Sequence, residues 1–318
     1  MTQRLLMSAL ILVALVSTPI QGQERSDSIT DEASLHKLDV RTPDELRAMF
    51  HYDGKPMLLL SAHRGGAGPG YPENCIETFE HTLRSTFSMF EVDPRMTKDG
   101  EIVIHHDATL DRTTTGTGKL VEKTLAELKQ LKLRDSDGNV TPYTIPTLDE
   151  TLAWAKGKTI LVLDQKDVSV EKRVAKIQEH NAEPCAMLIV NTLADAKACY
   201  AANKNIMMEA MITDSKKFSD FDASGIPWEN IIAFLGHSAP IDEKLFSAVH
   251  DKGSRCMVGT SRNFDRNFAS RLAIDSPGLR KDYEDLLGRG VDVIETDIPR
   301  ELAGLLSERI HVTSPPKR

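Results

Sequence analysis

Short apolar runs alternate with amphipathic helical stretches along most of this 318-residue chain, and this alternation restricts its fold more than any other feature. Nine runs have the length and composition of β-strands: residues 57–62, 89–95, 102–105, 159–164, 186–190, 206–212, 231–235, 255–259 and 291–296. Helical patterns lie between several of them, at residues 75–84, 148–154, 170–180, 194–202 and 243–252. Repeated β-then-α units predict a mainly parallel sheet covered by helices.

Such an alternation fits both a doubly wound open sheet and a closed barrel, and periodicity alone does not separate the two. Ionisable residues gather at the carboxyl ends of several of the predicted strands, which is where barrel enzymes build their sites. We therefore predict an α/β fold of the (β/α)8 TIM barrel type. Nine candidates exceed the eight strands of such a barrel, and we expect the run at residues 231–235 to be peripheral.

The first residues have the pattern of an export signal. Arg4 precedes an apolar run over residues 5–16, Pro19 interrupts it, and polar residues follow. The run is shorter than the roughly 20 residues that span a bilayer, although an uncleaved anchor is the alternative. We predict a signal peptide over residues 1–22, a single barrel domain over residues 23–318, and a periplasmic or secreted protein with no stable membrane insertion after cleavage.

Charge and cysteine content exclude little. A formal net charge of −8, from 39 basic and 47 acidic residues, argues against a nucleic-acid partner, because such proteins usually carry a basic face. The four cysteines, Cys75, Cys185, Cys199 and Cys256, show no Cys-x-x-Cys pattern of a zinc site. An even count permits a disulfide between Cys185 and Cys199, but we favour free core thiols.

Carboxylates follow two of the apolar runs. Glu91 and Asp93 project to the same side of a strand, because side chains alternate. Two carboxylates so close repel each other unless a cation lies between them, and oxygen ligands suit a hard divalent cation. A solvated strand face is the alternative, but both faces of a parallel barrel strand are usually covered. Asp164 and Lys166 also share a face at a strand end, where a metal–phosphate site or an ordinary salt bridge would fit.

Histidines end two further runs. His63 and Arg64 follow the run that begins at residue 57; a histidine transfers protons near neutral pH and a guanidinium clamps phosphate. A histidine in a turn beside a surface arginine is the alternative. His105 and His106 point to opposite faces, so we expect one of them in a site and His105 to be structural.

Together these residues resemble the motifs of the glycerophosphodiester phosphodiesterase family. The similarity is dense in the first half of the chain and clear in its last strand, and between residues 168 and 288 only the general pattern matches. The matching stretches are His63-Arg64-Gly65, Pro72-Glu73-Asn74, Glu91-x-Asp93, Thr97-Lys98-Asp99-Gly100, His106-Asp107, Leu110-x-Arg112-Thr113-Thr114-x-Gly116, Ile145-Pro146-Thr147-Leu148 and Gly290-Val291-Asp292-Val293-Ile294-x-Thr296-Asp297-x-Pro299.

The resemblance implies a (β/α)8 barrel, a divalent cation and a mechanism with two histidines. His63 and His106 would be the acid and base, and Glu91 and Asp93 would be metal ligands. The family's third ligand is usually a glutamate, which Asp164 replaces here. An aspartate is one methylene shorter, so cation affinity and substrate range are open. Carboxylate-only ligation suits one divalent cation, Ca²⁺ or Mg²⁺.

The resemblance also implies a substrate and a reaction. Arg64 and Lys166 would hold the phosphate, and Glu73 and Asn74 would support substrate binding from their loop. The expected reaction is hydrolysis of a small phosphodiester, a glycerophosphodiester, to glycerol phosphate and an alcohol.

One departure from the family leaves the leaving group open. The family commonly has a Trp-Thr-Val-Asn-like run in the penultimate strand, where this chain has Met257-Val258-Gly259-Thr260. A lysophospholipase D-like enzyme and a glycerophosphoinositol-directed enzyme use the same scaffold and are the nearest alternatives. A non-catalytic binding protein on a retained barrel is a third. The sequence does not give the oligomeric state.

Overall fold

A computed structural model describes residues 34–237, 242–266 and 277–310. The predicted signal peptide at residues 1–22 lies outside these residues. The compact unit that carries the barrel begins at Ser34. In the described residues, no helix combines the length and the apolar character needed to cross a membrane.

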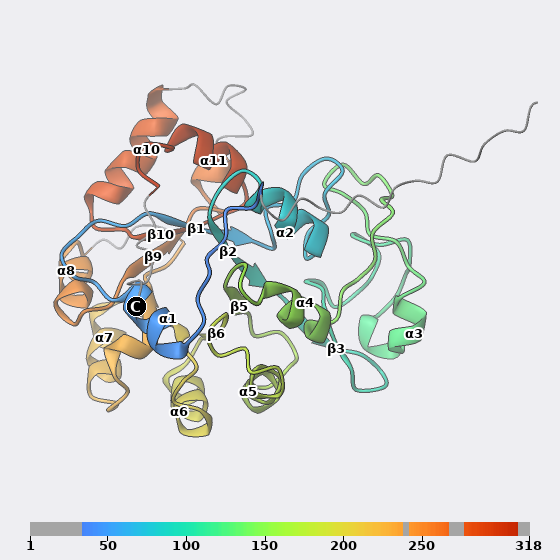
Figure 1. Cartoon of the computed structure of the whole chain (residues 1–318), viewed down its shortest axis with the longest axis horizontal. Coiled ribbons are helices and arrows are strands. Elements are labelled where there is room, and N and C mark those ends of the chain that lie inside the picture. The colour runs from blue at the N-terminus through green and yellow to red at the C-terminus, as the bar shows by residue number, and fades with distance from the viewer. Residues whose placement is uncertain (1–33, 238–241, 267–276, 311–318) are drawn as a thin grey trace, which may run out of the picture. The chain divides into compact units, whose positions relative to one another are not determined.

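Eight parallel strands close into a barrel, which confirms the predicted (β/α)8 fold, and helices surround the strands (Figure 1). Around the barrel the strands follow one another in the order β1, β10, β9, β8, β7, β6, β5, β2. They span Leu59–His63 (β1), Ser88–Val92 (β2), Leu161–Leu163 (β5), Ala186–Val190 (β6), Met208–Met211 (β7), Ile231–Phe234 (β8), Cys256–Gly259 (β9) and Val293–Thr296 (β10).

The five helical stretches predicted from the sequence are present, and the described residues contain further helices that were not predicted. The described helices span Pro43–Phe50 (α1), Ile76–Leu83 (α2), Leu125–Leu128 (α3), Leu148–Ala155 (α4), Val170–Glu179 (α5), Leu193–Ala202 (α6), Ser215–Asp222 (α7), Lys244–Asp251 (α8), Pro277–Gly288 (α10) and Pro299–Leu305 (α11), with 3₁₀ turns at Leu120–Glu122 (η2) and Trp228–Asn230 (η3). Several begin at a side chain that accepts a hydrogen bond from the first turn, as Thr147, Ser169 and Thr192 do. Such caps satisfy amide groups that the helix itself leaves unpaired.

The expectation that residues 231–235 are peripheral is wrong. They form β8, which pairs with β7 and β9 inside the barrel. The additional run is the one at residues 102–105, which forms β4 (Ile102–Ile104) and pairs antiparallel with β3 (Pro94–Met96) outside the barrel. The predicted strand at residues 89–95 is divided into β2 and β3, because Pro94 has no amide hydrogen to continue a ladder.

Three apolar clusters hold the described part together. One fills the inside of the barrel with residues such as Met187 and Met207. Leu46, Met49 and Phe50 of α1 belong to the same cluster. The largest lies between the strands and the surrounding helices. The third lies around β4, η2 and α3 and consists of Cys75, Val103, Leu110, Leu120, Leu128, Leu133 and Ile145. Most of this small cluster comes from the excursion between β2 and α4, which is also tied to the largest cluster through Ile102 and Ile104.

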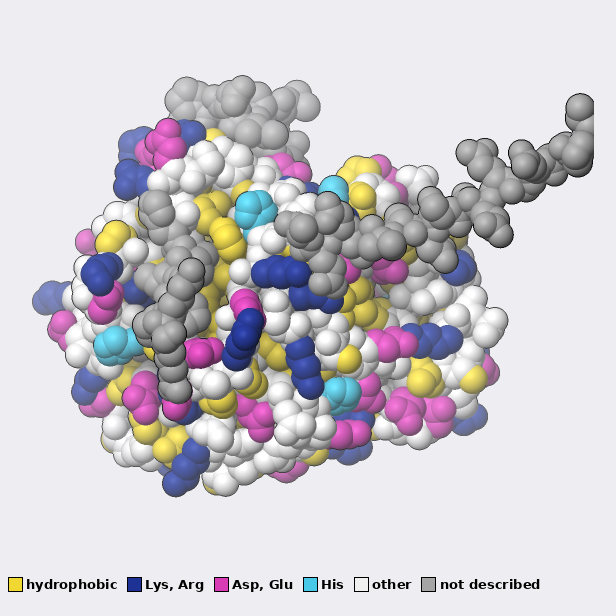
Figure 2. Space-filling view, viewed as in Figure 1, with side chains coloured by type: hydrophobic (Ala, Val, Ile, Leu, Met, Phe, Trp, Pro, Cys, Tyr) yellow, Lys and Arg dark blue, Asp and Glu magenta, His cyan; other side chains and the backbone are white. Residues whose placement is uncertain are grey.

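The cysteines do not form a disulfide. Cys75, Cys185, Cys199 and Cys256 are all free and buried, as the favoured prediction has it. Burial raises the pKa of the Cys185 thiol to about 11, which keeps it in its unreactive protonated form. On the face seen in Figure 2, acidic and basic side chains of the described residues are interspersed, and neither sign forms a continuous patch there.

Candidate active site

A polar cavity of about 250 Å³ lies at the carboxyl ends of the barrel strands. Six of the residues predicted for the site line it: His63, Arg64, Glu91, His106, Asp164 and Lys166. It is also lined by Gln165, Ile189, Asn191, Glu209, Met211, Phe234, His237, Arg262 and Glu295. The strand ends therefore bring together residues that are more than 100 positions apart in the sequence, as barrel topology requires.

Three carboxylates form a compact group at this end of β2 and β5. Each of Glu91, Asp93 and Asp164 offers an oxygen that lies within 4.8 Å of the others. Glu91 and Asp93 are buried, and the ammonium of Lys166 lies 2.5 Å from Asp164 Oδ2 and 3.0 Å from Asp93 Oδ1. This donor set fits one hard divalent cation.

The electrostatics of the group favour a positive charge among the three oxygens. Burial, followed by the nearby Asp93 and Asp164 carboxylates, raises the pKa of Glu91 well above its usual value. Burial also acts to raise the pKa of Asp93, but Lys166 and other neighbours outweigh it, and the pKa lies below its usual value. A bound cation would favour the charged form of all three carboxylates.

His63 is fixed at the end of β1 by an aspartate. Its Nδ1 lies 2.6 Å from Asp297 Oδ1, and its Nε2 lies 3.9 Å from Glu91 Oε2. Burial lowers the pKa of His63, but the hydrogen bond with Asp297 and the charge of Glu295 outweigh burial and raise it. Because the Asp297 carboxylate accepts from His63, Nδ1 carries the hydrogen, and Nε2 is the nitrogen on the side of Glu91.

His106 is held in a similar way from outside the barrel. Its Nδ1 lies 2.7 Å from Asp107 Oδ1, and Arg112 donates to Asp107 Oδ2 over 2.7 Å. Arg95 of β3 donates two hydrogen bonds to the carbonyl of His106. Burial lowers the pKa of His106, and the hydrogen bond with Asp107 offsets this only in part. The two aspartate-bound histidines therefore differ in their affinity for a proton.

The structural role predicted for His105 is confirmed. The side chain is buried and is not among the residues that line the cavity, with Nε2 3.0 Å from Thr113 Oγ1 and Nδ1 3.0 Å from the Asp107 carbonyl. Burial is the main reason that its pKa is lowered.

The loop after β1 supports the carboxylates from behind. The amide of Arg64 donates to Glu91 Oε2 over 3.1 Å, and Asn74 Nδ2 donates to Asp93 Oδ2 over 2.6 Å. Asp93 in turn donates its amide hydrogen to Asn74 Oδ1. Arg64 and Asn74 have φ values of 52° and 55°, a left-handed conformation that costs energy for residues with a Cβ. The buried Asn74 amide thus positions a candidate ligand.

Glu73 links the arginines near the two histidines. Both of its oxygens accept from Arg112 over 2.8 Å, and Oε2 lies 3.5 Å from Arg64 Nη1. The paired geometry with Arg112 is the planar fork that makes such pairs specific. Glu73 therefore orients Arg64 in the cavity and, through Arg112, the aspartate that holds His106.

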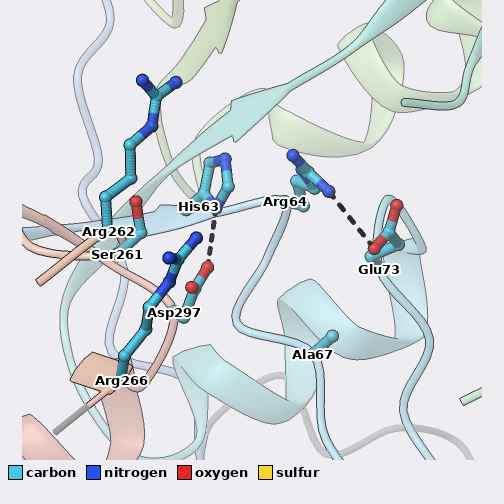
Figure 3. A pocket seen from close by; sticks show the side chains of 8 residues that line it. All are labelled: His63, Arg64, Ala67, Glu73, Ser261, Arg262, Arg266 and Asp297. Atoms are coloured by element: carbon cyan, nitrogen blue, oxygen red, sulfur yellow. Dashed lines mark hydrogen bonds and ion pairs between the residues drawn. The ribbon is translucent and has the colours of Figure 1, made fainter. Parts of the chain in front are cut away.

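A second recess of about 390 Å³ adjoins the cavity and shares His63, Arg64 and Arg262 with it. Figure 3 shows its lining residues: His63 joined to Asp297, with Arg262 and Arg266 on one side and Arg64 with Glu73 on the other. Three guanidinium groups around one recess suit an anion, because each offers several donors in a fixed plane.

Several residues in and around the cavity and the adjoining recess were not identified from the sequence as site residues. Asp107 and Asp297 lie inside recognised motifs, directly after His106 and directly after β10. For Asp107, an acidic residue beside a histidine is the signal; for Asp297, it is an acidic residue at the carboxyl end of a strand. Glu209 is the one charged residue in the apolar run at 206–212. His237, Arg262 and Arg266 follow strands in the half of the chain where the family motifs are absent.

Comparison with known proteins identifies the family. The profile of the "Glycerophosphoryl diester phosphodiesterase family" matches residues 63–301, which is most of the chain. A glycerophosphodiester phosphodiesterase of Bacillus altitudinis is 41% identical over 252 residues, which are 76% of this chain and 96% of that protein. A protein of Bacillus subtilis is 24% identical over 258 residues, which are 99% of its length, and several other curated relatives match over shorter stretches, from 33% to 54% of their own length.

Solved structures agree with this assignment. A glycerophosphoryl diester phosphodiesterase from Parabacteroides distasonis superposes with a TM-score of 0.82 at 40% identity, and the match covers 88% of this chain and 96% of that one. An Oleispira antarctica phosphodiesterase, solved in complex with the product sn-glycerol-3-phosphate, has the same fold with a TM-score of 0.58 at 21% identity, over 80% of this chain and 98% of that one. The chain therefore belongs to the glycerophosphoryl diester phosphodiesterase family and is a phosphoric diester hydrolase.

Proposed function

We propose that this enzyme is cation-dependent and hydrolyses glycerophosphodiesters to glycerol phosphate and an alcohol, with His63 and His106 transferring the protons. The observation that carries the proposal is that two aspartate-bound histidines line one polar cavity together with Glu91 and Asp164, and that the buried Asp93 lies beside these two carboxylates. The product bound to the Oleispira antarctica phosphodiesterase, sn-glycerol-3-phosphate, is one that this chemistry yields.

The proposed mechanism balances the charge and the protons of the reaction. A cation held by Glu91, Asp93 and Asp164 would neutralise the negative charge of the phosphate oxygens. Arg64 and Lys166 bind the same oxygens from the protein side. One histidine takes the proton of the attacking hydroxyl as its oxygen bonds to phosphorus. The other histidine protonates the alcohol oxygen as its bond to phosphorus breaks. The attacking hydroxyl comes from water, or from the glycerol, in which case it forms a cyclic phosphate that water then opens to glycerol phosphate.

The polar lining of the cavity favours a small polar leaving group. Of the described residues that line it, Ile189, Met211 and Phe234 are apolar and the other twelve are polar or charged. A choline, ethanolamine, glycerol or inositol ester therefore fits the cavity better than an ester with a long acyl chain.

One observation favours a lysophospholipase D-like enzyme as the second candidate. A groove of about 240 Å³ shares Asn191 and Met211 with the cavity, and Leu193, Ala196 and Phe221 contribute apolar surface to it. An acyl chain could extend along this groove while the phosphate lies among the carboxylates. Turnover of a lysophospholipid in preference to glycerophosphocholine would favour this candidate.

The proposed function is tested by the release of alcohol from a panel of glycerophosphodiesters. We expect turnover to stop with EDTA and to return with Ca²⁺ or Mg²⁺, because Asp93 and Glu91 lose their counter-charge without the ion. Activity that persists in EDTA, with the ion shown by elemental analysis to be gone, would contradict cation dependence.

We further propose that the protein is exported and that residues 1–22 are removed, from the order of Arg4, the apolar run and Pro19. Expressed at full length in a Gram-negative host, it is expected in the periplasmic fraction with a mature N-terminus close to Gln23. Intact-mass analysis of that fraction measures the cleavage. A full-length mass, or a protein confined to the membrane fraction, would instead indicate an uncleaved anchor.

A further inference from the structure

A buried carboxylate that the proposed mechanism does not use faces the cavity from the opposite side of the barrel. Glu209 extends from β7 into the cavity and is fully buried. In the described part of the protein neither of its oxygens has a hydrogen-bond partner. Burying a carboxyl group without a partner is unfavourable, and buried polar groups are nearly always paired. Glu209 is therefore placed to bind something that enters the cavity.

Two further acceptors lie near Glu209. His237 follows β8, and its Nδ1 is buried without a hydrogen bond in the described residues and lies 3.9 Å from Glu295 Oε1. Glu295 is on β10 and also lines the cavity. We call Glu209, His237 and Glu295 the acceptor wall.

The missing side chain of Gly259 makes room for this wall. A Cβ at Gly259 would lie 2.5 Å from His237 Nδ1 and 3.2 Å from Glu295 Oε1. An alanine there would displace the imidazole, so the imidazole can occupy its place only beside a glycine. Gly259, on the strand between β8 and β10, thus leaves the space that the His237 ring occupies.

The wall suits a ligand group with several hydrogen-bond donors. A quaternary ammonium has none and usually binds within an aromatic cage, whereas Phe234 is the one aromatic ring apart from the histidines among the described lining residues. Burial, followed by the neighbouring Glu295 and Asp164, raises the pKa of Glu209 well above its usual value. Burial also lowers the pKa of His237 to about 4. Carboxyl oxygens and a neutral imidazole nitrogen both accept hydrogen bonds from hydroxyl groups.

We propose that the acceptor wall binds the hydroxyl groups of a polyol esterified to the phosphate. This proposal rests on the proposed function only in placing a phosphate ester among Glu91, Asp93 and Asp164. The polyol could be the glycerol half of the substrate or a polyol leaving group, and both have the same chemistry. Recognition by hydrogen bonds makes the wall selective, because an analogue without the hydroxyls leaves buried acceptors unpaired.

The test compares the binding of phosphate monoesters that differ only in their hydroxyl groups. Calorimetry with the full-length, cation-loaded protein gives Kd for sn-glycerol 3-phosphate against propyl phosphate, and for myo-inositol 1-phosphate against cyclohexyl phosphate. We expect the wild type to prefer the hydroxylated member of at least one pair by about tenfold or more, as the loss of one or two hydrogen bonds implies. The pair that shows the preference identifies the source of the polyol.

Glu209→Met is expected to remove that preference while changing Kd for the ester without hydroxyls less than twofold. Gly259→Ala, which displaces His237, is expected to weaken the preference by a second route. Ile189→Val, in the apolar part of the same cavity, is the matched control and keeps the preference. Because methionine replaces an unpaired buried carboxyl, Glu209→Met is also expected to melt at or above the wild-type temperature. Misfolding would then not explain the loss of preference for the hydroxylated ester in this variant.

Three results would overturn the proposal. They are an unchanged preference in Glu209→Met, an equal loss of affinity for all four esters, and a second equivalent of cation in the wild type that Glu209→Met lacks. The last would indicate a second metal site. These readouts do not depend on turnover: a wild type that binds the esters selectively and hydrolyses no diester would contradict the proposed function and leave the acceptor wall in place.

Discussion

His63→Ala and His106→Ala are each expected to lower kcat by about 10²–10⁴-fold, because each removes one positioned proton-transfer group. In both rings Nδ1 is held by an aspartate and Nε2 is left for the substrate. Initial rates on glycerophosphocholine at saturating cation measure the effect. Circular dichroism and the melting temperature are expected to stay close to those of the wild type, since neither ring belongs to an apolar cluster.

His180 provides the matched control for these variants. It ends α5 and also pairs with an aspartate, Nε2 lying 2.8 Å from Asp149 Oδ1, but it does not line the cavity. His180→Ala is expected to keep wild-type turnover. Near-normal rates for either His63→Ala or His106→Ala would remove that histidine from the mechanism.

Asp93→Asn is expected to weaken binding of the divalent cation by more than about 100-fold, since even second-layer partners of metal ligands are worth about 10–100-fold. Asp93 is completely buried, is held by Asn74 and Lys166, and supplies one of the three carboxylates of the group, so the substitution removes a charged ligand from its interior. Calorimetric titration of the metal-free protein with Ca²⁺ or Mg²⁺ measures the change, and turnover is expected to need correspondingly more cation.

Asp164→Glu is the informative comparison for this variant. It introduces the residue that the family usually carries at this position and keeps the negative charge, so cation binding and turnover are expected to be retained. Asp220→Asn, in an exposed ion pair with Lys216 on α7, serves as the surface control. Unchanged cation affinity in Asp93→Asn would show that the ion does not bind to the Glu91, Asp93 and Asp164 group.

The carboxyl ends of the strands could be read from the sequence, because an apolar run that stops at an ionisable residue marks both the strand and the site. Glu91, Asp164 and His63 were identified in this way and lie together. What could not be read is which strand pairs with which. The run Ile102–Ile104 has the composition of a barrel strand, and only its antiparallel partner β3 places it outside.

The second half of the site was hidden for a different reason. Glu209 and Glu295 each interrupt an otherwise apolar strand, and alternation assigns them to the inside of the barrel, where a charge is unexpected. That conflict between position and chemistry was a usable signal. For Asn74 the sequence indicates a role near the substrate, but only the packing shows that its amide is buried against Asp93.

The excursion between β2 and α4 has a consequence for how this enzyme loses activity. His106 follows β4, which contributes Val103 to the small cluster with Leu110 and Leu128 and Ile102 and Ile104 to the largest cluster, whereas His63 belongs to the barrel itself. Parts of a protein with separate cores open with separate free energies. Local opening of the excursion would move one histidine away from the other while the eight strands stay closed. Mild heat or denaturant would then abolish turnover reversibly before the barrel unfolds. Amide hydrogens around β4 would exchange with solvent faster than those in the barrel strands.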